Sequence, residues 1–228
     1  MIKKKIMWII SLWIYCLNIP FFLQASTEKI VMIDPGHGGF DPGKIGINGT
    51  YEKQINLSIA KELKKYLEDK GIEVVMTRES DEDLDGMEGK AHKNKDMQKR
   101  KEAINNSKAD ILISIHQNAF TDSKVKGFQV FYYTGSVGGE QLAGSVDQIL
   151  KEKINPENKR PIKDTNNYYV LRVTKMPAII VECGFLSNEE EEALLKDSKY
   201  QERLAHAIGE GILTYFSRQG IEKTKSLE

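Results

Sequence analysis

The chain has 228 residues, with 33 Lys and Arg side chains against 33 Asp and Glu, 40% hydrophobic residues and two cysteines. A chain of this length and composition forms about one folded domain, which excludes disordered, collagen-like and disulfide-rich classes of protein. The formal net charge of zero also argues against a nucleic-acid partner, because binding by bulk electrostatics needs a clustered cationic surface.

The first 25 residues have the order of an export signal. Lysines at positions 3–5 precede an almost uncharged apolar stretch over residues 6–23, and the small residue Ala25 follows. We expect cleavage after Ala25, or retention of the segment as an N-terminal membrane anchor, since its apolar length is at the lower limit for spanning a bilayer. Either outcome carries the domain across a membrane, and membrane contact is expected only through residues 1–25 if they stay uncleaved.

The remainder of the chain, residues 26–228, is slightly acidic. The leading segment holds three lysines and no acidic residue, so the remainder carries 30 basic and 33 acidic side chains, a formal charge of −3. Cys183 is the one cysteine left, which excludes an internal disulfide. An exported domain without a disulfide must rely on its hydrophobic core, or on a core helped by a metal.

Short apolar runs predict five strands in this remainder. Runs of this length, rich in β-branched residues, are typical of buried strands. In chain order they cover residues 30–33, 72–76, 111–115, 127–133 and 178–183.

Apolar residues at helical spacing predict helices between these strands. The first helix is striped from Ile55 to Leu67, with Thr50 as its N-cap and Gly71 at its end. Further helices are predicted over residues 96–107, over residues 140–154, after a capping box of Ser187 with Glu190, and over a final stripe from Leu204 to Tyr215.

The alternation of strands and helices predicts an α/β fold. We expect a single layered domain over residues 26–228, with a mostly parallel central sheet flanked by helices on both faces. Two polar stretches fit this plan poorly: residues 79–99 are expected to form an exposed excursion, and residues 155–167 a polar connection.

Three predicted strand ends carry a histidine or a glutamate. His37 follows the first strand, His116 follows the third, and Glu182 lies near the end of the fifth. In an open α/β sheet, ligands bind beyond the carboxyl ends of the strands. Because the three residues come from separate segments, local crowding in the sequence does not explain the coincidence, and a functional site is indicated.

The loop over residues 34–43 is the densest of these signals. Its glycines permit positive φ angles and close backbone approach, so they suggest that His37 is held at a tightly folded site. A nucleotide-binding loop is an alternative, but the pattern G-x-G-x-x-G fails at Asp41, and Gly43-Lys44 is followed by Ile45. A simple turn with an incidental histidine is the other alternative.

His116 and Glu182 do not indicate a functional site equally strongly. A histidine such as His116, taken alone, is more often a buried residue with satisfied hydrogen bonds than a ligand. A carboxylate inside the apolar run around Glu182 is costly unless it is paired or metal-bound, and burial raises its pKa toward the range of a general base. Two histidines with carboxylates suggest zinc, although no His-Glu-x-x-His helix is present.

Five motifs in chain order resemble one family. They are Asp-Pro-Gly-His-Gly-Gly at 34–39, Tyr-Glu-Lys with Asn-Leu at 51–57, Thr-Arg at 77–78, Ser-Ile-His with Asn at 114–118, and Val-Glu with Gly-Phe-Leu-Ser-Asn at 181–188. The chain resembles the zinc-dependent N-acetylmuramoyl-L-alanine amidases of the type-3 amidase family, over about residues 29–217.

The resemblance implies a set of site residues and a reaction. It implies His37, Glu52 and His116 as ligands of one Zn²⁺ ion and Glu182 as the catalytic glutamate. The family hydrolyses the amide between the lactyl group of N-acetylmuramic acid and L-alanine in peptidoglycan. We expect the following residues to shape or bind the substrate cleft: Asn118, Arg78 or Arg172.

Within the family, the chain is similar to the germination-specific, CwlD-type amidases of spore-forming bacteria. That similarity implies action in the spore cortex, on the way to muramic-δ-lactam, at the cell wall or between the forespore membranes, and in some cases with an activating partner protein. Two other functions stay open at this point: a non-catalytic amidase-like protein that binds or regulates the wall, and another zinc peptidase or deacetylase. The intact site residues argue against the first and the motif order against the second.

Gln117 and Cys183 lie next to predicted site residues. Gln117 stands where the family often has a small residue, which is expected to change the cleft beside the metal. Cys183 neighbours Glu182, and strand alternation points it to the opposite face of the sheet. We therefore expect a buried packing thiol rather than a nucleophile.

Overall fold

The computed structural model describes residues 29–82, 84 and 93–225. The predicted export segment lies outside the described residues, as does most of the predicted excursion before residue 93. Within the described part of the chain, no helix has the length and apolar character needed to cross a membrane.

Six strands form one mixed sheet in the order β2-β1-β3-β6-β4-β5. Parallel pairing joins β1 to β2, β1 to β3, β3 to β6 and β4 to β5, and β4 runs antiparallel to β6. The predicted α/β fold with a mostly parallel sheet is confirmed. The strands are β1 (Ile30–Pro35), β2 (Glu73–Met76), β3 (Ile111–Asn118), β4 (Gln129–Tyr133), β5 (Lys163–Thr165) and β6 (Ala178–Phe185).

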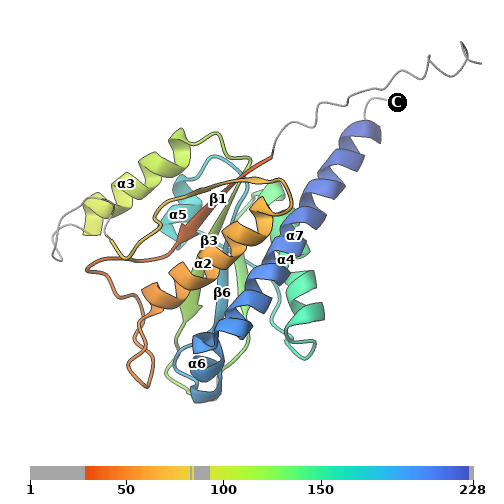
Figure 1. Ribbon diagram of the computed structural model, residues 1–228. Helices are drawn as coiled ribbons and strands as arrows, with labels where there is room; N and C mark the ends of the chain where they lie inside the picture. Colours follow the sequence, from red (N-terminus) through yellow and green to blue (C-terminus); the bar gives the residue numbers. More distant parts are fainter. Residues whose placement is uncertain (1–28, 83, 85–92, 226–228) are drawn as a thin grey trace, which may run out of the picture.

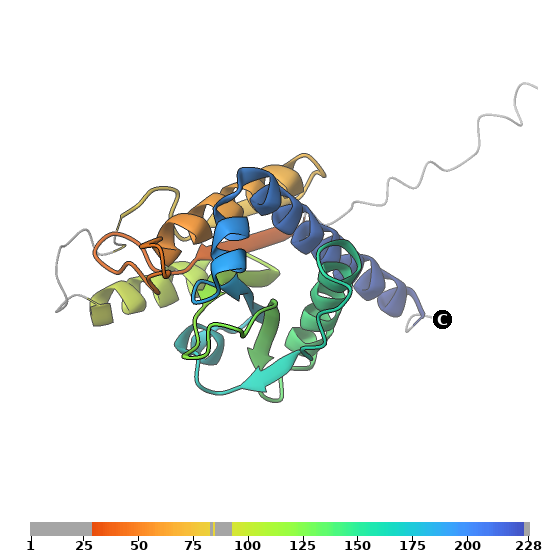
Figure 2. The ribbon, with the colours of Figure 1, turned by 90° about the horizontal axis from the view of Figure 1, so that it is seen from below.

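Helices cover both faces of the sheet (Figures 1 and 2). Helices α2, α4 and α7 pack on one face, and α3 and α5 on the other. The helices described are α2 (Glu52–Glu68), α3 (Lys93–Asn106), α4 (Val137–Lys153), α5 (Tyr169–Val173), α6 (Glu189–Lys196) and α7 (Ser198–Lys225).

The central strands are apolar on both faces because each face is covered by helices. On β1, Val31 and Ile33 belong to the core beneath α2, α4 and α7, whereas Met32 belongs to the core beneath α3 and α5. Successive strand residues point to opposite faces, so a strand with both faces buried reads as a continuous apolar run. This geometry fixes the carboxyl ends of β1, β3 and β6 side by side.

The structure differs from the prediction in its helix caps. Thr50 does not cap α2: the N-cap position is Tyr51, without a side-chain hydrogen bond, and the backbone N–H of Thr50 donates to Glu192 at 3.4 Å. The predicted N-cap at Ser187 is displaced by one residue, because Asn188 accepts a hydrogen bond from the N–H of Glu191 at 3.0 Å. The carboxylate of Glu191 accepts from the N–H groups of Gly127 and Phe185.

The polar connection before residue 168 also contains more structure than predicted. Strand β5 adds to the sheet edge beside β4, and the short helix α5 follows it. An edge strand of three residues is held by backbone pairing and has no apolar alternation, so the sequence carries no period-2 signal for it.

Candidate active site

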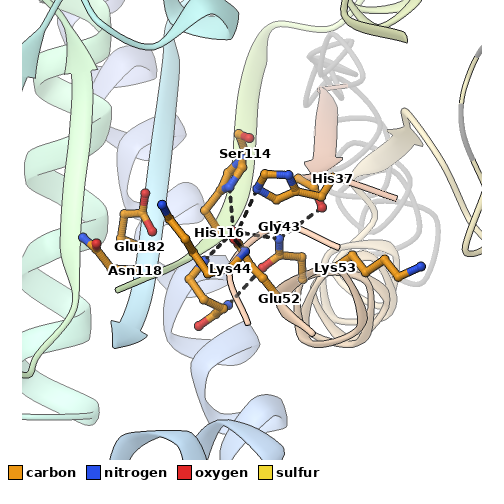
Figure 3. Close-up of polar contacts among 12 residues, drawn as sticks. His37, Gly43, Lys44, Glu52, Lys53, Ser114, His116, Asn118 and Glu182 are labelled. Atoms are coloured by element: carbon orange, nitrogen blue, oxygen red, sulfur yellow. Dashed lines mark hydrogen bonds and ion pairs between the residues drawn. The ribbon is translucent and has the colours of Figure 1, made fainter. Parts of the chain in front are cut away.

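The predicted strand-end residues meet at one edge of the sheet. His37 follows β1, and Glu182 lies within β6 as predicted. His116 lies within β3, because this strand extends further than predicted. Glu52 is the first residue of α2. In Figure 3, His37, Glu52 and His116 are turned toward one another, with Glu182 and Asn118 nearby.

His37, Glu52 and His116 form a compact group of metal-ligating side chains. Their candidate ligand atoms all lie within 4.8 Å of one another. One carboxylate oxygen of Glu52 lies 2.9 Å from Nδ1 of His116, and the other lies 3.2 Å from Nε2 of His37. The two imidazole rings meet edge to face, with centroids 5.0 Å apart.

Glycines make this close approach feasible. A Cβ atom at Gly36 would lie 2.2 Å from the ring of His116, and one at Gly43 would lie 2.5 Å from the carboxylate of Glu52. His37 itself has a φ angle of 62°, in the left-handed region that is unusual for a residue other than glycine. The glycine-rich loop therefore serves to bring one imidazole against the other two side chains.

Glu52 is a fully buried carboxylate with several hydrogen-bond donors around it. It accepts hydrogen bonds from the backbone N–H of Lys44 at 2.7 Å and of Gln117 at 3.0 Å, and from the amide of Asn56 at 3.2 Å. Burial raises the pKa of Glu52, but the hydrogen bonds and charges of His116 and His37 outweigh burial and hold this pKa far below its ordinary value. Glu52 is therefore an ionised carboxylate in the folded protein, as a candidate metal ligand requires.

His37 has a carboxylate on each side. Its Nδ1 lies 2.9 Å from Asp41, on the ring edge opposite the one that faces Glu52. Burial lowers the pKa of His37, but hydrogen bonds with Asp41 and Glu52 raise it to about 9. A carboxylate bonded to the second ring nitrogen commonly fixes the tautomer and orientation of a metal-ligating histidine, and Asp41 is placed for that role.

These three side chains fit a zinc ion. Two imidazole nitrogens and one carboxylate oxygen are ligands that zinc prefers, and three protein ligands leave a fourth position open, as in catalytic zinc sites. Glu52 is buried between the two histidines, so it places a negative charge where a metal cation would bind.

Glu182 enters the same space from β6. It is 6% exposed, and its Oε1 accepts a hydrogen bond from the hydroxyl of Tyr168 at 3.1 Å. Its buried Oε2 has no hydrogen-bond partner among the described residues. Burial raises the pKa of Glu182, with His116 acting against the rise. This arrangement matches the requirements of a general base.

All four side chains line one cleft of about 680 Å³. Aromatic and apolar residues complete the wall around the charged group, which is typical of a small-molecule or peptide site. The additional lining residues include Phe40, Met97, Tyr168, Tyr169 and Val170.

Of the three residues predicted to shape the substrate cleft, Asn118 lines it, and Arg78 and Arg172 are absent from its lining. Arg78 is 3% exposed and donates to the carbonyls of Pro35 and Gly36 at 3.0 Å each, so it supports the loop before His37. Arg172 is exposed on α5, 5.6 Å from the ring centre of Tyr169.

The structure contains a buried ion pair beneath the loop of His37 that the sequence did not predict. Arg100 donates to the carboxylate of Asp34 and, at 3.1 Å, to the carbonyl of His37. The hydroxyls of Thr77 and Ser114 each donate to Asp34 at 2.8 Å. Asp34 is visible in the sequence as an acid at a strand end, but its partners come from three other elements, so nothing local predicts them.

Gln117 and Cys183 both point away from solvent. Gln117 is 2% exposed, and its amide donates to Asn56 at 3.1 Å. It contacts the network behind Glu52, and it is among the residues that line the cleft. Cys183 is buried, and burial raises the pKa of its thiol, in agreement with a packing role.

Three comparisons agree on the relationship of this chain to known proteins. The family model described as N-acetylmuramoyl-L-alanine amidase matches residues 31–214. The germination-specific N-acetylmuramoyl-L-alanine amidase of Bacillus subtilis strain 168 is 39% identical over 204 residues, covering 88% of this chain and 85% of the relative. The AmiA amidase of Escherichia coli K12 is 29% identical and covers 85% of this chain and 78% of the relative.

A solved structure has the same fold. The CwlD amidase from Clostridioides difficile, solved in complex with the GerS lipoprotein, has a TM-score of 0.80 and 39% sequence identity, covering 83% of this chain and 99% of that chain. With the family match over residues 31–214, this chain belongs to the N-acetylmuramoyl-L-alanine amidase family and is an enzyme that acts on peptidoglycan.

Proposed function

We propose that the enzyme uses zinc to hydrolyse the amide between the lactyl group of N-acetylmuramic acid and L-alanine, and that it acts during maturation of the spore cortex. The observation that carries the zinc assignment is the group of His37, Glu52 and His116, whose ligand atoms lie within 4.8 Å of one another in the cleft that also holds Glu182. The cortex role is supported by 39% identity to a germination-specific relative.

The proposed chemistry divides between the metal and Glu182. Zinc, when bound by His37, Glu52 and His116, would supply a Lewis acid that polarises the lactyl carbonyl and lowers the pKa of water. Glu182 accepts a proton from the attacking water as the new C–O bond forms. It then returns the proton to the alanine nitrogen as the C–N bond breaks, which leaves a free amine and a lactyl carboxylic acid that ionises at neutral pH.

Export and a protein partner complete the proposal. We propose that residues 1–25 direct the enzyme across the cytoplasmic membrane, to the cell wall or the space between the forespore membranes. The amidase from Clostridioides difficile was solved with a lipoprotein, which supports an activating partner protein for this enzyme as well.

Product analysis tests the proposed reaction. Purified enzyme with zinc is incubated with peptidoglycan, and mass spectrometry should find new L-alanine amino termini together with intact, peptide-free muramic acid. New amino termini inside the peptide stem would identify a peptidase instead. For the cortex role, deletion of the gene should remove muramic-δ-lactam from purified spores, and cortex with normal lactam content would contradict it.

A further inference from the structure

Within the described residues, the side chain of Glu182 accepts one hydrogen bond, from the hydroxyl of Tyr168. The hydroxyl donates to Oε1 at 3.1 Å, while Oε2 is buried without a partner. The two carboxylate oxygens thus have different surroundings, one bonded to a protein donor and the other enclosed by the protein. Both Tyr168 and Glu182 line the cleft with the three candidate ligands.

Two features hold Tyr168 in this position. Tyr168 is the N-cap residue of α5, so its backbone is held at the start of that helix. Its side chain makes no capping hydrogen bond there. Its ring packs against Phe131 with centroids 5.3 Å apart. Phe131 lies on β4 and pairs with Ile180 of β6, the strand that carries Glu182. The phenol is therefore fixed relative to the carboxylate by the sheet itself.

We propose that Tyr168 is a positioning residue for Glu182, and that its hydrogen bond to Oε1 holds the carboxylate in the orientation in which it accepts and returns the proton. This inference rests on the proposed function, because it assumes that Glu182 is the base. The phenol keeps its own proton throughout, so the proton taken from water resides only on Glu182 before it passes to the alanine nitrogen. Burial and then the charge of Glu182 raise the pKa of Tyr168, which keeps the hydroxyl a donor.

A carboxylate without this bond would rotate about its last side-chain torsion, which is broad and roughly two-fold. Productive geometry would then be populated for a smaller fraction of the time, although the substrate would bind as before. Hydrogen bonds to charged groups are among the stronger ones in proteins. Because only the orientation of Glu182 changes, the loss of activity should appear in kcat and leave KM unchanged.

The variant Tyr168→Phe tests the inference, because it removes the hydroxyl and keeps the ring contact with Phe131. We expect kcat to fall at least about tenfold, with KM, bound zinc and melting temperature equal to those of the parent enzyme. Tyr200→Phe makes the same chemical change on a partly buried tyrosine of α7, outside the cleft, and should keep the parental kcat. A kcat for Tyr168→Phe within twofold of the parent, or a loss of zinc or folding, would overturn the inference.

A double-mutant cycle with Glu182→Asp separates positioning from a merely structural effect. Aspartate keeps a carboxylate but shortens the side chain, which withdraws it from Tyr168. If Tyr168 acts through Glu182, Tyr168→Phe should cost clearly less in this background than in the parent, whereas an equal loss in both backgrounds contradicts the inference. The variant Glu182→Gln tests the assumption beneath it: full activity there would refute the base, while an inactive Glu182→Gln with a fully active Tyr168→Phe would refute this inference alone.

Discussion

His116 on β3 and Glu182 on β6 are register partners in two neighbouring parallel strands. Such strands lie about 4.8 Å apart, so the sheet itself sets the separation between one candidate metal ligand and the candidate base. Sites carried on strands or helices hold their geometry better than sites carried on loops. Only His37 of this group comes from a loop. Asp41 restrains its ring, and the guanidinium of Arg100 donates to its backbone carbonyl.

The first prediction concerns the candidate base. Glu182→Gln removes the proton acceptor and keeps the shape of the side chain, so turnover should fall by about 10²- to 10⁴-fold, while bound zinc stays stoichiometric. Steady-state kinetics with metal analysis of the same sample measures both quantities. Glu202→Gln, an exposed position on α7, is the matched control. Normal turnover in Glu182→Gln would remove Glu182 from the mechanism.

The second prediction concerns the hydrogen bonds behind Glu52. Asn56 is 0% exposed and donates both to the Glu52 carboxylate and, at 3.1 Å, to the carbonyl of Gly36. Asn56→Ala should weaken zinc binding by about 10- to 100-fold, since residues that orient a ligand commonly have effects of this size. Competition with a zinc chelator gives the dissociation constant. The exposed Asn166→Ala serves as the control, and equal affinities in the two variants would contradict the prediction.

The third prediction compares two glycines. A Cβ at Gly36 would collide with His116, whereas a Cβ at Gly144 on α4 has no atom within 4 Å. Gly36→Ala should therefore lose zinc and activity. Gly144→Ala should keep both and gain about 0.5–1 kcal/mol of stability, because alanine is favoured over glycine inside a helix. Zinc analysis and urea unfolding measure these outcomes, and a zinc-replete Gly36→Ala would contradict the site geometry.

The fourth prediction is the pH dependence of stability contributed by Asp34. Burial raises the pKa of Asp34, but the Arg100 charge and the hydroxyls of Thr77 and Ser114 outweigh it and hold this pKa below its ordinary value. The stabilisation is therefore fully present above the unfolded pKa of about 3.9 and is lost as pH falls through the lower folded value.

Asp34→Asn isolates this contribution. Breaking a buried ion pair costs about 3–5 kcal/mol, so the variant should be less stable by that amount above about pH 5, and the difference should shrink as the pH falls toward 2. Urea unfolding of the zinc-free protein at a series of pH values gives the free energies. A constant difference over that range would contradict the assignment.

Sequence patterns predicted the layers of the fold and three positions of the site because both depend on local signals. His37, His116 and Glu182 follow or end apolar strands, and strand ends are where α/β domains bind ligands. Glu52 could be identified only through the resemblance to the amidase family. A glutamate in the first turn of a helix normally does no more than complement the helix dipole.

Other contacts depend on elements that only tertiary structure brings together. Tyr168 directly follows the polar connection over residues 155–167, and its contact with Glu182 requires β4 and α5 to be placed beside β6. Arg100 meets Asp34 across 66 residues of sequence. The cap at Thr50 was predicted wrongly because Tyr51 takes the N-cap position, and the backbone N–H of Thr50 bonds with Glu192.

The most direct test of the account is the zinc dependence of a defined product. Enzyme stripped with a chelator is titrated with zinc, and the release of peptide-free muramic acid with new L-alanine termini is measured by mass spectrometry. We predict no turnover without metal and full turnover at one zinc per chain, lost again in His116→Ala. Full activity of the stripped enzyme, or stoichiometric zinc in His116→Ala, would contradict the proposed centre of His37, Glu52 and His116.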